Sequence, residues 1–152
     1  MGEDHAIAAR LLLRQVNSGA LGTLGASGSP YVSLVAVLDD GAGRPLFLLS
    51  GLAEHTRNLL TDARASLLIA AETTKATMDR PRVTLSGRVK WLQGEEADAA
   101  RERFAGALPE AKVWVTLADF KPARLELEEL RAVGGFARAA TLSVEDYLAA
   151  KV

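Results

Sequence analysis

The sequence has 152 residues, of which 49% are apolar and 24% charged, with a formal net charge of -1 and no cysteine. This length favours a single domain, residues 1–152, and the balance of apolar and charged residues argues against a disordered chain or a coiled coil. The near-neutral charge disfavours nucleic-acid and anionic membrane partners. The absence of cysteine excludes disulfide bridges and thiolate metal sites.

The N-terminal residues predict a helix and no export signal. Asp4 is a candidate N-cap for apolar residues that recur at helical spacing, and Gly19 is placed to end that helix. The N-terminal segment, residues 1–5, is acidic overall, with Glu3 and Asp4. No apolar run reaches the length of a membrane span. We therefore expect a cytoplasmic protein without a membrane segment.

Three strand-like segments follow this helix, and turn residues separate each from the next. They are residues 20–24, 31–38 and 44–50, with turns at 26–29 and 39–43. Consecutive hairpins of this kind predict an antiparallel meander.

The middle of the chain predicts two further strands. Residues 64–71 are rich enough in apolar side chains to suggest a strand that is buried on both faces. Residues 83–92 alternate in polarity, and Gly87 is a candidate bulge of the sort that curves a sheet into a barrel.

The last third predicts helices around a final pair of strands. Residues 95–104 and 109–117 suit helices, whereas 120–127 and 131–136 suit strands. Ser143 begins a capping-box pattern that opens a short terminal helix. The total is six or seven strands.

A polar segment after the third strand is the strongest candidate for a chemical site. His55, Thr56, Arg57 and Asn58 offer an imidazole, a hydroxyl, a guanidinium and an amide beside a helix N-terminus, where free N–H groups favour an anion. Thr56 is the natural N-cap. The segment predicts a phosphate grip; the alternative is a surface turn in which Arg57 pairs with a neighbouring acid.

Polar residues also alternate on two strands. One face of the fifth strand carries Arg82, Thr84, Ser86 and Arg88. Such a face does not belong in a core, so it is either solvated or a wall of an anion or flavin pocket. Tyr31 and Ser33 alternate in the same way and leave the same two readings open.

The catalytic inventory of the chain is small. The histidines are His5 and His55, and the sequence contains neither a zinc-protease motif nor a serine nucleophile elbow. No metal site is predicted. If the protein does chemistry, we expect a bound cofactor to supply the reactive atoms.

Several stretches together resemble the pyridoxamine-5'-phosphate-oxidase-like, FMN-binding split-barrel family, and most closely its haem-utilisation (HugZ-type) branch. They are residues 30–33, 49–59, 62–68, 82–87, 119–120, 124–125 and 133–136. The resemblance therefore covers nearly the whole chain.

This resemblance implies a mainly β (α+β) fold, a six-stranded antiparallel split β-barrel with a few flanking helices, and a homodimer with FMN at the subunit interface. The independent count of strands agrees with it. By the resemblance, the residues that hold FMN are Tyr31, Val32, Ser33, Ser50, Arg82 and Thr84 around the flavin and His55, Thr56, Arg57 and Asn58 at its phosphate.

The chain also departs from the proteins it resembles. Vitamin B6 oxidases carry a basic Ser-Arg-Lys clamp where this chain has residues 54–56, and haem-degrading members carry a late histidine, whereas no histidine follows His55 here. We expect an FMN-binding, flavin-dependent oxidoreductase of unknown substrate. The alternatives are a haem-binding, haem-utilisation protein on the same barrel and a cofactor-free structural dimer.

Overall fold

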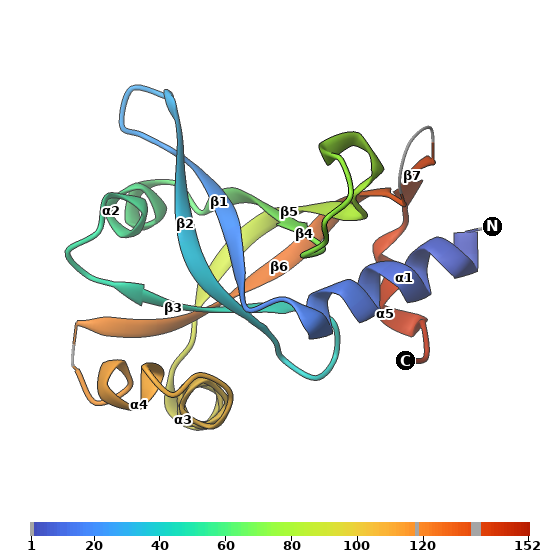
Figure 1. Cartoon of the computed structure of the whole chain (residues 1–152). Coiled ribbons are helices and arrows are strands. Elements are labelled where there is room, and N and C mark those ends of the chain that lie inside the picture. Colours follow the sequence, from blue (N-terminus) through green and yellow to red (C-terminus); the bar gives the residue numbers. More distant parts are fainter. Residues whose placement is uncertain (1, 118, 135–137) are drawn as a thin grey trace.

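A barrel of antiparallel strands forms the centre of the computed structural model, which describes residues 2–117, 119–134 and 138–152. The strands are β1 (Ser18–Leu24), β2 (Pro30–Asp39), β3 (Pro45–Ser50), β4 (Arg64–Ala70), β5 (Arg82–Trp91), β6 (Phe120–Val133) and β7 (Ala139–Leu142). Their order in the sheet is β3-β2-β1-β4-β5-β6-β7, and an additional pairing of β3 with β6 closes the first six into the barrel (Figure 1). The predicted six-stranded barrel is confirmed.

Helices cover parts of this barrel. They are α1 (Gly2–Gln15), α2 (Glu54–Thr61), α3 (Gly94–Ala107), α4 (Ala111–Trp114) and α5 (Val144–Ala149), with a 3₁₀ turn at Thr77–Asp79. In Figure 1, α3 and α4 lie beneath β3, α2 lies near one end of the barrel, and α1 and α5 lie together at the opposite side. None of the helices that the structure describes is long and apolar enough to cross a membrane.

The strand that is buried on both faces is β3. Phe47 and Leu49 belong to the core inside the barrel, whereas Leu46 and Leu48 pack with Phe104 of α3 in a second apolar cluster. The prediction that residues 64–71 are buried on both faces is wrong, because no such cover lies over β4. That strand alternates between buried and exposed residues.

The C-terminal strands differ from the prediction. The predicted segment 120–127 continues without a break to Val133 in the single strand β6, so residues 131–133 belong to it, and β7 was not predicted. Residues 135–136 of the second predicted strand lie outside the described residues. The bulge predicted at Gly87 is confirmed, since the β5–β6 register shifts between Ser86 and Gly87. A Cβ atom at Gly87 would overlap the carbonyl of Glu126.

The helix boundaries also correct two predictions. Asp4 lies inside α1 rather than at its N-cap, and Gly19 lies in β1, after the helix has ended at Gln15. The cap predicted at Ser143 is confirmed, because its Oγ accepts a hydrogen bond of 3.1 Å from the amide of Asp146.

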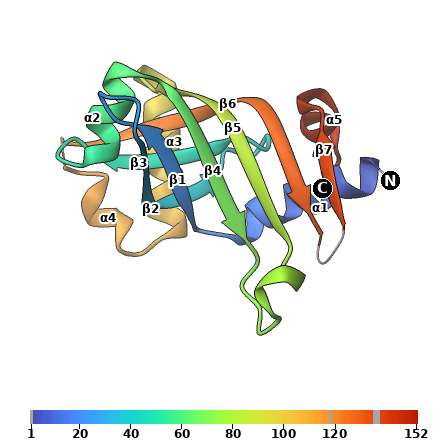
Figure 2. The ribbon, with the colours of Figure 1, turned by 90° about the horizontal axis from the view of Figure 1, so that it is seen from above.

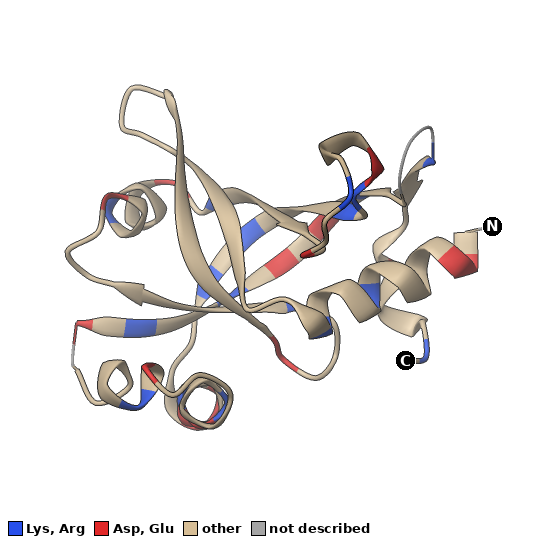
Figure 3. Cartoon of the chain, viewed as in Figure 1, with Lys and Arg blue, Asp and Glu red and all other residues tan. Residues whose placement is uncertain are grey.

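One outer face of the sheet is left open by the helices. Figure 2 looks onto β1, β4 and β5, which form this face. From Ser18 to Leu38 the β1–β2 hairpin carries no charged residue, and Asp39 ends β2 (Figure 3). It nevertheless exposes large apolar side chains, with Val32 66% and Leu34 80% accessible, and Leu68 on β4 is 44% accessible. An uncharged, partly apolar surface of this kind is typical of a binding face.

Candidate functional site

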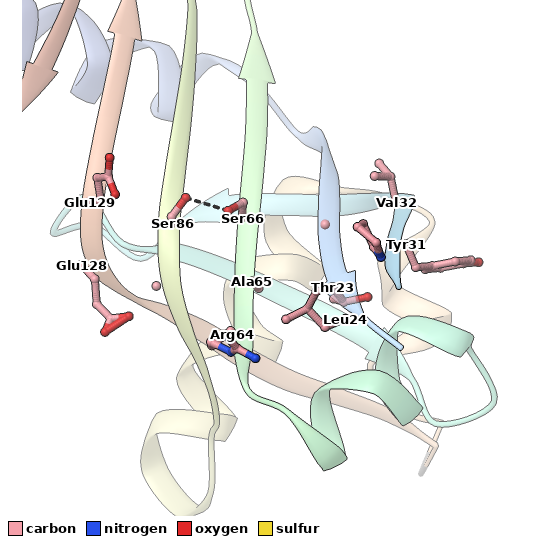
Figure 4. A pocket seen from close by; sticks show the side chains of 13 residues that line it. Thr23, Leu24, Tyr31, Val32, Arg64, Ala65, Ser66, Ser86, Glu128 and Glu129 are labelled. Atoms are coloured by element: carbon pink, nitrogen blue, oxygen red, sulfur yellow. Dashed lines mark hydrogen bonds between the residues drawn. The ribbon is translucent and has the colours of Figure 1, made fainter. Parts of the chain in front are cut away.

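A groove of about 410 Å³ lies on this open outer face. It is lined by Gly22, Thr23, Leu24, Pro30, Tyr31, Val32, Arg64, Ala65, Ser66, Ser86, Gly87, Glu128 and Glu129. Figure 4 shows these side chains spread over β1, β2, β4, β5 and β6. The volume falls within the range of small-molecule and cofactor sites.

The floor of the groove consists of small residues in register across three strands. Gly22 of β1 is the partner of Ser66 on β4, and Ser66 is the partner of Ser86 on β5. The hydroxyls of Ser66 and Ser86 form a hydrogen bond of 2.6 Å, which is drawn in Figure 4. The floor therefore presents a flat backbone surface and one pair of hydroxyls.

The two sides of the groove differ in polarity. Tyr31 and Val32 stand on the β2 side, and Glu128 and Glu129 stand on the β6 side (Figure 4). Tyr31 and Val32 are consecutive strand residues and point apart, so Val32 lies on the outer face with Gly22. An apolar ring system would find its contacts on the β2 side.

Arg64 lines one end of the groove, and a second guanidinium, that of Arg88, lies next to it outside the lining. Arg64 and Arg88 are direct register partners on β4 and β5, and both side chains are 60% exposed. Like charges directly opposite each other destabilise a sheet unless something neutralises them. The pair therefore attracts anionic groups, and the carboxylates of Asp62 and Glu128 already lie beside it.

Each of these arginines has one acidic neighbour. Arg64 donates to Asp62 at 2.7 Å, and this hydrogen bond is the main reason why the pKa of Asp62 falls to about 2. Arg88 lies 3.7 Å from Glu128, which is beyond hydrogen-bond length. Within the described part of the chain, Arg88 donates no side-chain hydrogen bond, so its N–H groups are available to a ligand.

The predicted phosphate segment lies within α2, and its imidazole is hydrogen-bonded to Ser33 of β2. Ser33 Oγ and His55 Nδ1 are 2.9 Å apart, whereas His55 Nε2 is buried and has no partner among the described residues. Burial lowers the pKa of His55. The imidazole is therefore disposed to be neutral, which weakens it as a grip for a phosphate.

Thr56 is tied to the end of β3. Its hydroxyl donates to the carbonyl of Ser50 at 2.6 Å, and the Ser50 hydroxyl accepts from the amide of Leu52 at 3.2 Å. The prediction that Thr56 is the N-cap is wrong: Ala53 occupies that position and offers no side-chain cap. The N-cap lies three residues earlier than predicted because the chain turns at once after β3.

The remaining two residues of the segment point in different directions. Asn58 is buried, and its side-chain amide donates to the Thr23 hydroxyl at 3.0 Å. Arg57 is exposed and donates to Glu54 at 3.1 Å and to the carbonyl of Leu52 at 3.0 Å. Asn58 thus connects α2 to β1, and the guanidinium of Arg57 lies at the surface.

The two predicted residues of β5 also separate. Arg82 donates to the carbonyls of Thr77, Met78 and Arg80, so it holds the 3₁₀ turn. Thr84 is exposed on the outer face, between Leu68 on β4 and Arg131 on β6. As predicted, this face of the strand is not core.

The ten predicted site residues therefore fall into three groups. Tyr31 and Val32 line the groove; Arg82 and Thr84 lie further along β5. The residues around α2 are Ser33, Ser50, His55, Thr56, Arg57 and Asn58. Their part in holding a cofactor stays a prediction.

Sequence reasoning missed most of the groove. Gly22, Ser66 and Glu129 were not predicted as site residues, and Arg64 was not connected with Arg88. Small or hydroxyl residues at alternating positions were a usable signal on each strand. The register that aligns them across strands is a tertiary property.

Metal-binding clusters give no alternative location for a site. In residues 2–117, 119–134 and 138–152, no group of three or more His, Asp or Glu side chains is arranged to hold a metal ion. Neither His5 nor His55 lines the groove.

Comparison with known proteins identifies a family and haem-related relatives. Residues 2–149 match the family model described as CREG, β-barrel. The chain is 36% identical over 129 residues to the non-canonical haem oxygenase HOZ, chloroplastic, of Arabidopsis thaliana, covering 82% of this chain and 39% of that protein. It is 35% identical to the heme binding protein from Mycobacterium smegmatis, with a TM-score of 0.90, covering 97% of this chain and 61% of that one. The chain thus spans less than two thirds of both relatives.

The fold extends to a more distant protein. A general stress protein 26-related protein of the pyridoxinephosphate oxidase family from Clostridium acetobutylicum has a TM-score of 0.73 at 14% identity, over 97% of this chain and 99% of that one. These findings confirm the family resemblance drawn from the sequence: a split barrel with haem-related members. The predicted cytoplasmic location stays a prediction, since the Arabidopsis relative is named chloroplastic.

Proposed function

Because this chain belongs to the CREG β-barrel family, we propose that it binds haem in the groove on the outer face of its barrel. The observation that carries the proposal is the shape and charge of that groove. It has a flat floor of small residues, an apolar side at Val32, and Arg64 at one end, with Arg88 beside Arg64 outside the lining. The names of the two relatives above 30% identity support the same ligand.

The groove suits the chemistry of haem. Haem is a flat and largely apolar macrocycle that carries two carboxylates on one edge. The floor would accept the plane, and Arg64 and Arg88 would bind the carboxylates, since a guanidinium matches a carboxylate in charge and geometry. Glu129 lies on the β6 side and would repel carboxylates placed there, whereas Glu128 already lies 3.7 Å from Arg88. The charges therefore favour one orientation of the ligand.

Binding, rather than haem breakdown, is the activity that these residues support. No histidine lines the groove, so none is placed there to coordinate iron. When bound, haem supplies iron for redox and oxygen chemistry. The residues of this chain would contribute the surface, the orientation and the carboxylate contacts.

A homodimer would complete this site. The groove is open on its outer side, and the uncharged hairpin beside it exposes Val32 and Leu34. A second copy that covers these side chains would also cover the groove. This interface places a ligand between the two subunits, as the sequence resemblance implies.

FMN is the second candidate, and the N-terminus of α2 favours it. The helix has no side-chain cap, and within the described residues the main-chain amides of Glu54 and His55 have no hydrogen-bond acceptor. A phosphate could accept from these amides and from Arg57. In that case the protein is a flavin-dependent oxidoreductase. Thr56 and Asn58 already serve internal hydrogen bonds, which makes this candidate the weaker one.

A ligand comparison tests the proposal. Purified protein is titrated with haemin and with haemin dimethyl ester, whose carboxylates are blocked, and in parallel with FMN and riboflavin. We expect a saturable change in the Soret band at one haemin per subunit, and weaker binding of the ester. No saturable binding of haemin, with FMN retained after desalting, would replace haem by flavin.

Two arginine variants locate the anionic end of the ligand. Arg88→Gln should weaken haemin binding by roughly threefold to tenfold, because a charge-assisted contact is lost, and leave the ester unaffected. Arg57→Gln should weaken FMN retention only if the phosphate lies at α2. Lys112→Gln, an exposed charge on α4, is the matched control for a change in net charge.

A further inference from the structure

Gly22 is a strand glycine that the fold itself does not require. A Cβ atom built on it would meet a single neighbour within 4 Å, the carbonyl oxygen of Ser66 at 3.5 Å, which is an ordinary contact. Its φ angle is not positive, so any residue could adopt its backbone conformation. A glycine inside a strand lowers stability relative to residues that favour strands. Something outside the chain is needed to explain it.

Two other strand glycines show what a structural requirement looks like. At Gly19 a Cβ atom would lie 2.8 Å from Leu67 Cδ1 and 2.9 Å from the carbonyl oxygen of Leu68. At Gly87 it would overlap the carbonyl of Glu126. Both are glycines because their own barrel leaves no room. Gly22 differs from them because the space above it is the groove.

The neighbours of Gly22 define the shape of that space. In the sheet register Gly22 lies between Val32 of β2 and Ser66 of β4, and all three line the groove. Neighbouring strands are about 4.8 Å apart, so the missing side chain leaves a slot roughly 10 Å wide between Val32 and Ser66. A glycine at such a position lets a ligand approach the backbone closely.

We propose that Gly22 determines which ligands the groove accepts, by letting a planar conjugated ring lie directly against the backbone of β1. This inference rests on the proposed function, because it concerns the same groove. Val32 bounds the ring on its apolar side, and the Ser66–Ser86 hydroxyl pair lies beneath its other half. Porphyrin and isoalloxazine rings share this flat shape, and a side chain at position 22 excludes both.

A size series at this position tests the proposal. Gly22→Ala and Gly22→Val are compared with the wild type for haemin and FMN affinity, melting temperature and dimerisation. Because the site tolerates a Cβ atom, we expect the melting temperature to stay or to rise by about 2–4 °C. Affinity for the ring should fall with side-chain size, by about tenfold or more for valine.

Gly25→Ala is the matched control. Gly25 directly follows β1 and does not line the groove. A Cβ atom there would lie 3.4 Å from the carbonyl oxygen of Ser29. It should leave ligand affinity unchanged. The ring that the wild type binds, porphyrin or flavin, identifies the ligand, and Gly22→Val should lose that ring.

The outcomes separate this inference from the proposed function. If the wild type binds neither haemin nor FMN, the proposed function fails and the inference fails with it. If the wild type binds a ring and folded Gly22→Val binds it equally well, the inference alone is overturned. If Gly22→Val abolishes dimerisation while the ring still binds, the glycine serves the approach of a second copy, and the inference is again overturned.

Discussion

Two parts of the molecule deal with polar and apolar groups in opposite ways. Where α1, α5 and the β2–β3 turn meet, Arg10 is 5% exposed and donates to the carbonyls of Tyr147, Leu148 and Ala150. The Tyr147 hydroxyl donates in turn to the carbonyl of Gly43 at 2.6 Å. On the groove face, by contrast, Leu34 and Val32 are exposed and Gly22 leaves a gap.

The difference separates residues that the chain explains from residues that need a partner. Arg10 binds the C-terminal carbonyls of α5, which favour a cation, so its burial follows from the fold. Gly43 has a φ of +94°, and a Cβ atom there would lie 2.6 Å from Arg10 Nε, so this glycine is also explained internally. Leu34 has no comparable contact within the described chain. Its position therefore points to something that covers it.

The largest effect on folding is expected at Arg10. Arg10→Met removes the hydrogen bonds that join α1 to the end of α5 and leaves buried carbonyls unpaired, which should lower the free energy of unfolding by about 2–4 kcal/mol. Urea unfolding monitored by circular dichroism measures this. Arg14→Met, on the same helix with a side chain 43% exposed, should change it by less than about 0.5 kcal/mol. Equal losses in the two variants would show that the hydrogen bonds of Arg10 to α5 do not stabilise the fold.

A smaller effect on folding is expected at Tyr147, whose phenol connects α5 to the β2–β3 turn. Tyr147→Phe removes the hydrogen bond to Gly43 and should lower the free energy of unfolding by about 1–2 kcal/mol at neutral pH. Tyr31→Phe, an exposed phenol, is the control.

The same phenol makes stability depend on alkaline pH. Burial raises the pKa of Tyr147 above its ordinary value. Unfolded tyrosine loses its proton near pH ~10, so the wild type should be fully stabilised by this group below that pH and lose stability above it. The free energy of unfolding of Tyr147→Phe should therefore fall less than that of the wild type between about pH 9 and about pH 11. An identical alkaline slope in both proteins would contradict this assignment.

The smallest effect on folding, and the largest on assembly, is expected at Leu34. Leu34→Glu places a charge on the open face of the hairpin, so the free energy of unfolding should change by less than about 0.5 kcal/mol when measured on monomer. A dimer that uses this face should dissociate, which sedimentation at several concentrations would detect. Leu60→Glu, on α2 with Leu60 70% exposed, is the control. A dimer that survives Leu34→Glu but not Leu60→Glu would move the interface to α2.

The sequence predicted the barrel better than it predicted the site. Apolar segments and the turn residues between them located strands β1 to β4, and alternation of polar and apolar residues located β5. Gly87 was recognised as a bulge from its position in that alternating segment. The wrong prediction of burial at β4 has a physical cause. An apolar segment has the same sequence pattern whether or not a helix covers its second face, and here α3 covers β3. The same ambiguity hid the exposure of Leu68.

The polar segment after β3 shows the limit most clearly. The sequence placed four functional groups in a row, and the prediction treated them as one phosphate grip. In the folded chain Thr56 donates to Ser50, Asn58 donates to Thr23, and Arg57 stays outside. Consecutive residues of a helix point in different directions, so neighbours in sequence do not converge on one ligand.

By itself the sequence determined the segments of strands β1 to β5, the short terminal helix capped at Ser143, and the family, because periodicity, turn residues and motifs are local properties. Only the tertiary structure decided which residues meet. Cross-strand register brought Gly22, Ser66 and Ser86 into one floor and set Arg64 beside Arg88. Register depends on how whole strands pair, and a shift by one residue would turn each of these side chains to the other face of the sheet.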